Sequence, residues 1–241
     1  PIPPYSGAGT SVRAAGDNFK ESILKDSREN LKKLQDRVQK LPLNTKHTFV
    51  PLAFYDFFTD AVKRESENKK IDLIIMGTKG ASGLKTVTIG SNTGDVMTKV
   101  KCPILAIPEN SQFKKPKEIA FPTDYHTGYS TNVLSFIVEM AKMNDASLSI
   151  LHVNKKDGDL SNEQLKNKEF LQEYLKTIDH SFYTLTHVNL ETAVECFTQS
   201  RDIDMIAMVA KNLNFLQRIL FRPAVEKISY HTDIPFLVLH E

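Results

Sequence analysis

The sequence predicts an α/β fold in which short parallel strands alternate with helices, and two observations carry this prediction. First, apolar runs such as residues 73–76 are too short for a helix and end at glycine, as buried strands of parallel sheets do. Second, segments with apolar residues at helical spacing separate these runs, most clearly over residues 18–40. Regular alternation of the two patterns is typical of a doubly wound parallel sheet.

The expected elements follow one another along the whole chain. In the first half we expect helices at 18–40, 56–69 and 92–100, and strands at 47–54, 71–76 and 104–107. In the second half we expect strands at 118–121, 147–153, 181–188, 203–209 and 235–239, and helices at 130–143, 161–178, 190–201 and 224–231. Residues 109–117 are polar and contain Pro116. They predict a linker between a domain at 1–110 and a domain at 117–241.

The two halves of the chain repeat each other. Residues 71–74 match residues 203–206, and residues 103–105 match residues 235–237, both at the offset 203 − 71 = 235 − 103 = 132. The second half therefore shows the five strands and four helices of a complete unit. The first half lacks the opening strand, helix and strand that residues 118–153 supply. We therefore expect the natural protein to start earlier, by roughly forty residues.

A glycine pattern follows the strand that ends at Met76. It reads G-x2-G-x9-G-S and comprises Gly77, Gly80, Gly90 and Ser91, with Asn92 opening the next helix. Glycine lets backbone amides approach a phosphate, and the first turn of a helix offers unpaired N–H groups and partial positive charge. Each glycine alone is explained by a turn, and Ser91 by a helix cap. Their joint spacing favours an anion cradle, although neither the P-loop nor the dinucleotide motif is present.

This pattern resembles the nucleotide-binding signature of the universal stress protein family, in its ATP-binding branch. The flanking words IDLIIMGT and CPILAIP are also similar to that family. The resemblance implies a Rossmann-like, adenine nucleotide alpha hydrolase-like sheet of order 3-2-1-4-5 in each half. It implies that Met76 flanks adenine, and that Gly77, Gly80, Gly90, Ser91 and Asn92 hold the ribose and phosphates of ATP, AMP or ADP, with Mg²⁺ accompanying the nucleotide. It also implies pairing of domains through their last strands, 104–107 and 236–239, and a homodimer as a further option.

The second half has lost the glycine signature. Its equivalent positions are Val209, Asn212, Arg222 and Pro223. Side chains at Val209 and Arg222 stand where a phosphate needs bare backbone, so we expect no nucleotide there in the manner of the family. Two interpretations of the nearby basic residues Lys211, Arg218 and Arg222 stay open: a different anion site, or exposed surface. Asp124 follows the first strand of this half, where the resemblance implies an aspartate that contacts the nucleotide. Two interpretations of Asp124 stay open: a structural cap of the turn, which we favour, or a ligand contact.

Composition excludes several classes of protein. The chain has 241 residues and a formal net charge of 31 − 29 = +2, which does not indicate nucleic-acid binding. It contains no apolar run of about 18 residues and no signal-peptide core, so we expect no membrane partner. Cys102 and Cys196 are expected to be reduced, buried thiols, as in the cytoplasm. The seven histidines show no metal-ligand spacing.

The main hypothesis is therefore a cytoplasmic stress-response protein whose first half binds ATP as a regulatory ligand. No residue is identifiable as a hydrolytic base, so whether the protein is an enzyme stays open. One alternative is a slow ATPase or phosphotransfer enzyme. The other is an interaction scaffold that binds no nucleotide.

Overall fold

The computed structural model describes residues 8–42, 46–78, 91–126, 128–154, 159–210 and 233–240. The chain divides into two compact units, residues 1–61 and residues 62–241. The first unit holds one long helix and the segment that follows it. The second unit holds a single β-sheet and the helices that cover it.

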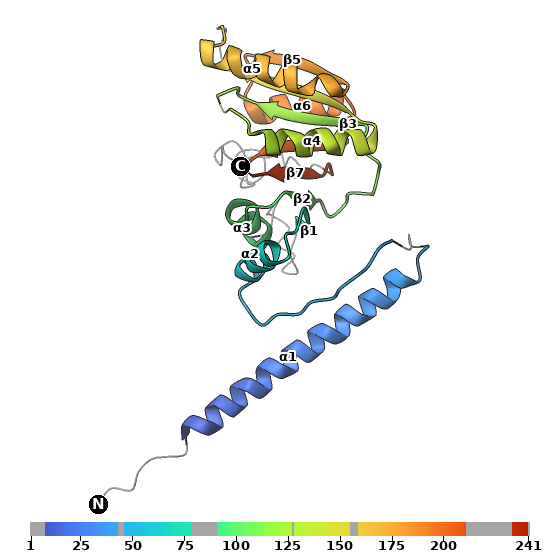
Figure 1. The fold of residues 1–241 in the computed structure, drawn as a ribbon, viewed down its shortest axis with the longest axis vertical. Coiled ribbons are helices and arrows are strands. Elements are labelled where there is room, and N and C mark those ends of the chain that lie inside the picture. The colour runs from blue at the N-terminus through green and yellow to red at the C-terminus, as the bar shows by residue number, and fades with distance from the viewer. Residues whose placement is uncertain are drawn as a thin grey trace, which may run out of the picture. The chain divides into compact units, whose positions relative to one another are not determined.

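Helix α1 (Ala8–Gln39) dominates the first unit and begins ten residues before the expected start at Asn18. The strand expected at 47–54 is wrong, because these residues run without regular structure (Figure 1). A strand is held by hydrogen bonds to a neighbouring strand, and the described residues contain no such neighbour for this segment. The segment is instead linked to the helix by Gln35, whose Nε2 donates to the Phe49 carbonyl at 3.2 Å.

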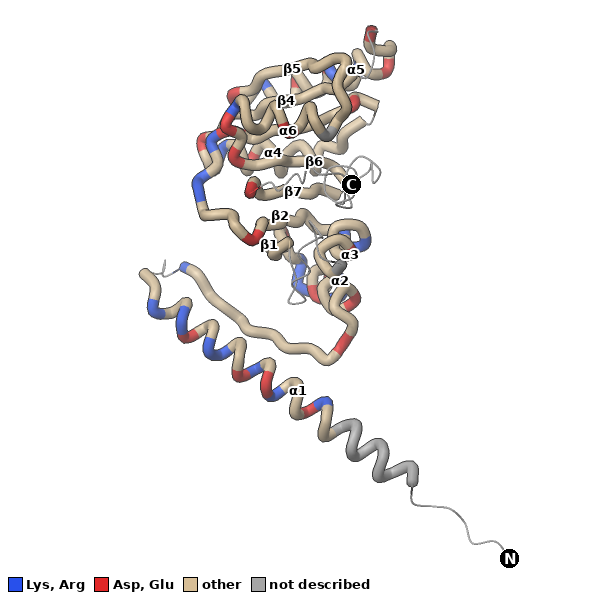
Figure 2. The backbone as a smooth tube through the Cα atoms, turned by 180° about the vertical axis from the view of Figure 1, so that it is seen from behind, with Lys and Arg blue, Asp and Glu red and all other residues tan. Residues whose placement is uncertain are grey.

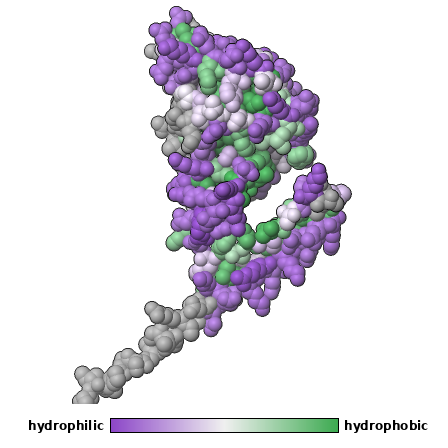
Figure 3. Space-filling model, viewed as in Figure 1, coloured by the Kyte–Doolittle hydropathy of each residue, from purple (hydrophilic) through white to green (hydrophobic). Residues whose placement is uncertain are grey.

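The surface of α1 is strongly charged. Acidic and basic residues alternate along its described side chains (Figure 2), and such charges stabilise a helix surface when opposite signs lie three or four residues apart. Hydrophobic residues gather instead on the segment that follows the helix (Figure 3). None of the helices among the described residues combines the length and the apolar character that crossing a bilayer requires.

The second unit is built on a seven-stranded sheet of order β1-β2-β7-β6-β3-β4-β5. Its strands are β1 (Ile74–Gly77), β2 (Ile104–Ile107), β3 (Glu118–Thr123), β4 (Ser147–Asn154), β5 (His180–Thr186), β6 (Met205–Val209) and β7 (Phe236–Leu239). All neighbours are parallel except β2 and β7, which pair antiparallel with Leu105 opposite Leu237. The expected pairing of the last strands of the two halves is therefore present within one chain. The strands of the second half lie in the order 3-2-1-4-5.

Helices of both halves pack against this sheet. They are α2 (Phe58–Asn68), α3 (Ser91–Lys99), α4 (Thr131–Asn144), α5 (Asn162–Tyr174) with the 3₁₀ turn η1 (Leu175–Thr177), and α6 (Leu190–Ser200). One core cluster joins apolar residues of α3 and α6 to the sheet, with Val62 of α2 packed against it. A second cluster on the opposite face joins residues of α4, α5 and η1. The expected helix at 224–231 lies outside the described residues.

The helices of the second half begin at side-chain caps that the sequence contains. Ser130 Oγ accepts the Val133 N–H at 3.4 Å, and Asn189 Oδ1 accepts the Thr192 N–H at 2.8 Å. Ser161 and Gln164 form a complete capping box at the start of α5. These caps satisfy amides of the first turn that have no partner in the helix, and so they fix where each helix begins.

Asp204, immediately before β6, clamps the linker against the start of β3. Its side chain is 7% exposed, and one carboxylate oxygen accepts from Lys114 Nζ at 2.6 Å. The other oxygen accepts the backbone N–H groups of Lys117 at 2.7 Å and Glu118 at 3.1 Å. Burial alone raises the pKa of Asp204, but the hydrogen bonds and the charge of Lys114 together outweigh it, so the pKa lies below its usual value. The carboxylate therefore sets where the first strand of the second half enters the sheet.

The two cysteines differ in burial. Cys102 is buried, as expected, and its Sγ donates to the Ile71 carbonyl at 3.2 Å. Burial raises the pKa of the Cys102 thiol, with the nearby Asp72 charge adding to the effect. Cys196 is exposed on α6, so its expected burial is wrong; it lies on the outer side of a helix whose inner side holds Val194 and Phe197. Both thiols are free.

Candidate functional site

The described members of the glycine pattern lie at the carboxyl end of β1 and at the start of α3. Met76 is half-buried and Gly77, the last residue of β1, is exposed. Ser91 is the first residue of α3, and Asn92 is exposed in its first turn. Gly80 and Gly90 lie outside the described residues.

A threonine that the sequence analysis missed joins these two elements. Thr93 Oγ1 donates to the Gly77 carbonyl at 2.8 Å, and the Thr93 side chain is buried. The bond ties the first turn of α3 to the end of β1, so the unpaired N–H groups of that turn belong to the same edge of the sheet as Gly77. The sequence does contain a signal for this role of Thr93. The equivalent position in the second half, 93 + 132 = 225, is Val225, which has no hydroxyl.

Packing holds α3 in this orientation. Val96 and Met97 of α3 are fully buried against the sheet, together with Ile104 of β2. Beyond β1, the Thr78 N–H donates to the Ile107 carbonyl at 2.9 Å and keeps the chain on β2 for one more residue. The strand end and the helix start are therefore fixed by the core and not only by their own hydrogen bond.

The far end of α3 is held by the second half of the chain. His240, which follows β7, forms a hydrogen bond between Nε2 and the Met97 carbonyl at 2.8 Å. Its Nδ1 is buried and has no hydrogen-bond partner. Burial lowers the pKa of His240, which keeps the ring neutral with the proton on Nε2. The first turn of α3 thus lies at the candidate site, and its last turn contacts the second half of the chain.

The corresponding edge of the second half is filled by an aromatic pair. Tyr125, just after β3, is 1% exposed, and its ring stacks on His152 of β4 with centroids 4.7 Å apart. Its backbone has the left-handed φ of 56°, which is unfavourable for a bulky residue and is held by tertiary contacts. Asn167 Nδ2 donates to the Tyr125 carbonyl at 2.7 Å, and the Tyr125 N–H donates to Thr123 Oγ1 at 3.1 Å. Burial raises the pKa of Tyr125 to about 12.

The position of this pair matters because ligands of open α/β sheets bind where the strand order reverses. In the second half that point lies between β3 and β6. Asp124, at the same end of β3, accepts the His126 N–H on Oδ1 at 3.0 Å. Its carbonyl accepts from Gln164 Nε2 at 2.9 Å. These contacts agree with the interpretation of Asp124 as a cap of the turn.

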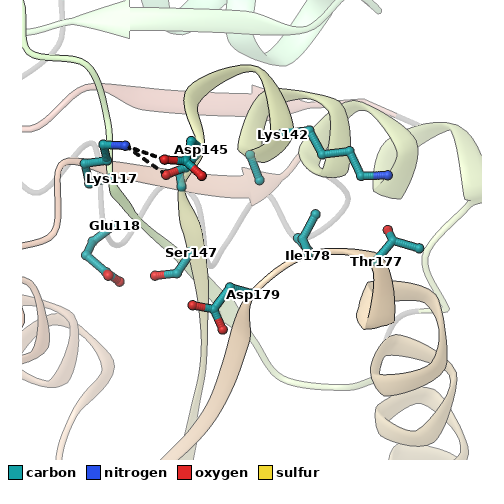
Figure 4. A pocket seen from close by; sticks show the side chains of 10 residues that line it. Lys117, Glu118, Lys142, Asp145, Ser147, Thr177, Ile178 and Asp179 are labelled. Carbon is teal, nitrogen blue, oxygen red and sulfur yellow. Dashed lines mark hydrogen bonds and ion pairs between the residues drawn. The ribbon is translucent and has the colours of Figure 1, made fainter.

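A cavity of about 480 Å³ opens at the other end of the sheet, the amino ends of β3, β4 and β5 (Figure 4). Lys117 and Asp145 line one side of the cavity, with Lys117 Nζ 2.9 Å from Asp145 Oδ2. Lys142, Asp179 and Ser147 also line it. This is the end opposite the one where parallel sheets bind ligands, so we do not assign the cavity a function. Within the described ranges, no group of three or more His, Cys, Asp or Glu residues is arranged to hold a metal ion.

The fold and the strand-end site define the class of the protein: a doubly wound α/β protein with a glycine-bearing connection between a strand and a helix that starts beside it. The model of the universal stress protein family matches residues 59–108 and 116–240. The chain belongs to the universal stress protein family.

Individual proteins are similar to parts of this chain in sequence or in fold. Universal stress protein MJ0531 of Methanocaldococcus jannaschii is 42% identical over 53 residues, which are 22% of this chain and 28% of that protein. A universal stress protein from Archaeoglobus fulgidus DSM 4304 has a similar structure, with a TM-score of 0.68 at 15% identity over 93% of this chain and 81% of that one. A universal stress protein from Archaeoglobus fulgidus solved in complex with dAMP has a TM-score of 0.37 at 13% identity and covers 53% of this chain.

Proposed function

We propose that the first half binds an adenine nucleotide, ATP with Mg²⁺, as a regulatory ligand, and that the protein serves a stress response in the cytoplasm. The observation that carries this proposal is the hydrogen bond from Thr93 to Gly77, which holds the start of α3 at the carboxyl end of β1. Family membership supports it. The intact G-x2-G-x9-G-S pattern of the first half, which the second half lacks, supports it as well.

In this proposal each residue has a role that its chemistry suits. Met76 flanks the adenine with a soft, apolar side chain. Gly77, Gly80 and Gly90 let the backbone approach the ribose and phosphates, and Ser91 and Asn92 offer the amides of the first helical turn. Mg²⁺ enters with the phosphates, whose oxygens are the ligands it prefers. We assign no catalytic residue.

The second half has a structural role in this proposal. Val209 ends β6 where Gly77 ends β1, and Tyr125 with His152 fills the end of β3 and β4. The two family domains, 1–110 and 117–241, are then a binding half and a supporting half joined through β2 and β7.

A pair of equivalent substitutions tests the proposal. Gly80→Val places a branched side chain in the first-half loop, and Asn212→Val makes the matched change at the equivalent position of the second half. Calorimetric titration with ATP and Mg²⁺ is expected to lose at least about tenfold in affinity for Gly80→Val only. Equal affinities for both variants and the unmodified chain contradict the proposal and favour the interaction scaffold. Phosphate release that depends on Gly80 indicates the slow ATPase instead.

A second pair of variants tests the role of the hydrogen bond from Thr93 to Gly77. Thr93→Val removes the hydroxyl that binds the Gly77 carbonyl, and Thr98→Val removes a hydroxyl that bonds only within α3. We expect Thr93→Val to weaken ATP by about fivefold, the value of one hydrogen bond, and Thr98→Val to leave it unchanged. If both variants bind ATP equally, the link between β1 and α3 does not shape the site.

A further inference from the structure

A second cavity, of about 400 Å³, lies at the amino ends of β3, β4 and β5 beside the one in Figure 4. The two cavities share Glu118, Ser147 and Asp179. The first continues to α4 and η1 on one face of the sheet, and the second continues to the end of α6 on the other face. The second cavity is therefore a separate place, with a volume in the range of small-molecule sites.

Serine hydroxyls line this second cavity. Ser147 and Ser149 lie on the face of β4 that carries Leu151 into the cluster with α6, and Ser181 of β5 lies directly opposite Ser149. Ser149 is only 5% exposed, yet its Oγ has no hydrogen-bond partner among the described residues. Buried hydroxyls are normally paired, because an unpaired one has lost its hydrogen bonds to water. A buried, unpaired hydroxyl that lines a cavity therefore indicates a polar ligand.

The charges that line the cavity are mostly negative. Its carboxylates belong to Glu118, Asp179 and Asp202. Arg201 adds one positive charge, so the sum is 1 − 3 = −2. The guanidinium of Arg201 is held over the Tyr183 ring at 4.5 Å, and its Nη1 donates to the Tyr183 hydroxyl at 3.3 Å. The cavity thus keeps a negative balance that favours a cation.

The helix that ends at this cavity favours a cation as well. α6 runs toward the amino ends of the strands and finishes at Ser200, immediately before two of the lining residues. The carboxyl end of a helix carries partial negative charge, whereas the helix starts at the other end of the sheet attract phosphate. The two ends of the sheet therefore suit ligands of opposite charge.

The spacing of the carboxylates favours an extended organic cation over a metal ion. In the part of the chain that the structure describes, no three His, Cys, Asp or Glu residues are grouped closely enough to hold a metal ion. Ammonium groups spaced along an aliphatic chain match carboxylates that are spread around a cavity. Each ammonium also has three N–H donors, which suits a serine oxygen without a partner.

We propose that the cavity beside Ser149 binds a linear aliphatic diamine or polyamine. One ammonium group donates to the Ser149 hydroxyl and to the Glu118 carboxylate, and the other is neutralised by Asp179 and Asp202. The site belongs to the second half of the chain, which the proposed function leaves without a ligand. It lies at the opposite end of the sheet from the strand end at which nucleotide is proposed to bind.

Calorimetric titration of the full chain with 1,5-diaminopentane and with spermidine, at physiological ionic strength and without nucleotide, tests the proposal. We expect one site per chain, a loss of about tenfold in affinity for Ser149→Ala and a loss of about fivefold for Glu118→Gln. Asp145→Asn is the matched control. It removes a carboxylate at the same end of the sheet that is bonded to Lys117 and lines only the other cavity, so it is expected to bind both amines normally.

A matched ligand tests the charge of the site. L-Lysine is 1,5-diaminopentane with a carboxylate added, and we expect it to bind at least about tenfold more weakly because that carboxylate meets a negative cavity. Lysine that binds as tightly as the diamine overturns the proposal. So does the absence of binding by either amine at millimolar concentration, or an equal loss of affinity in Ser149→Ala and Asp145→Asn.

Circular dichroism checks that each variant is folded. If Ser149→Ala does not fold, Glu118→Gln decides, because its residue is only half-buried and the substitution keeps the size of the side chain. Amine affinity in Glu118→Gln equal to that of the unmodified chain then overturns the proposal. These titrations contain no nucleotide, so this inference and the proposed function fail separately.

Discussion

Strands β1 and β6 occupy equivalent places in the two halves, yet their burial differs. Both pair in parallel with the last strand of their half, and two equivalent backbone hydrogen bonds adjoin each ladder. In the first half, the Ile74 N–H donates to the Pro103 carbonyl at 2.8 Å and the Thr78 N–H to the Ile107 carbonyl at 2.9 Å. In the second half, the Ile206 N–H donates to the Pro235 carbonyl at 3.0 Å and the Ala210 N–H to the Leu239 carbonyl at 2.8 Å. β1 nevertheless alternates between half-buried and exposed residues, whereas the first four residues of β6 are buried.

The comparison teaches that neighbours, more than composition, decide how far a strand contributes to the core. The sequences IDLIIMG and IDMIAMV have the same apolar pattern. Among the described residues, β6 has a second strand beside it and helices on both faces, and β1 pairs with β2 alone. Because hydrophobic stabilisation scales with the area removed from water, the same kind of residue stabilises the second half more than the first.

The largest expected effect comes from truncating the matched isoleucines. Ile206 is fully buried, so Ile206→Ala should cost about 2 to 5 kcal/mol in free energy of unfolding. Ile74 is only half-buried, and Ile74→Ala should cost less than half of that. Urea unfolding followed by circular dichroism measures both. Equal losses would show that β1 packs as well with its one described partner strand as β6 does with two.

The matched aspartates give the next effect. Asp204→Asn weakens charge-assisted bonds to Lys114 and two amides, for a loss of about 1.5 to 3 kcal/mol, whereas Asp72→Asn should change stability little. The folded-state pKa of Asp204 is lowered, so its stabilisation is present above the unfolded pKa and is lost as pH falls through the folded value. Urea unfolding from pH 7 to pH 3 should therefore show a smaller acid loss in Asp204→Asn than in the unmodified chain. An identical pH profile in the two proteins would show that the Asp204 carboxylate does not stabilise the folded chain through these bonds.

His240 is expected to make the junction of the two halves sensitive to acid. Burial lowers its pKa in the folded chain, so protonation favours the unfolded state. Stability from this residue is full above the unfolded pKa of about 6.5 and falls as pH drops below it. His240→Gln keeps a donor to the Met97 carbonyl, and it should remove part of the stability difference between pH 7.5 and pH 5.5, less than about 1.5 kcal/mol. A variant with the unmodified pH difference would contradict this role.

The smallest effect is expected at Ile75. Because its side chain is largely exposed, Ile75→Ser should change the free energy of unfolding of this chain by less than about 0.5 kcal/mol. The equivalent change Ala207→Ser, in a fully buried site, should cost more because it buries a hydroxyl. A large loss for Ile75→Ser would mean that the face beside β1 is already covered.

Local sequence patterns predicted most of the fold of residues 62–241. Apolar runs bounded by glycine or proline located the strands, with 104–107 at the bounds observed for β2. The strand expected at 47–54 failed, because its apolar pattern is real but a strand also needs a partner. Its equivalent, β5, pairs with β4 over its whole length. The local pattern carries no information on whether such a partner is present.

The candidate site was predictable only in part for the same reason. The glycine spacing identified the strand end and the helix start by local sequence alone. Thr93 and the Tyr125–His152 pair were missed because their roles depend on contacts with other elements, 16 residues away for Thr93. Comparison of the two halves offered a signal, since Thr93 has no hydroxyl counterpart at Val225.

The central claim, that nucleotide binds the first half and not the second, is tested most directly by hydrogen exchange with and without ATP and Mg²⁺. The segments to compare are residues 76–94 and their equivalents, residues 208–226, within one sample. The account predicts slower exchange in residues 76–94 alone, with no change in residues 208–226. Slower exchange in residues 208–226, or no change in either segment at saturating ATP, would contradict it.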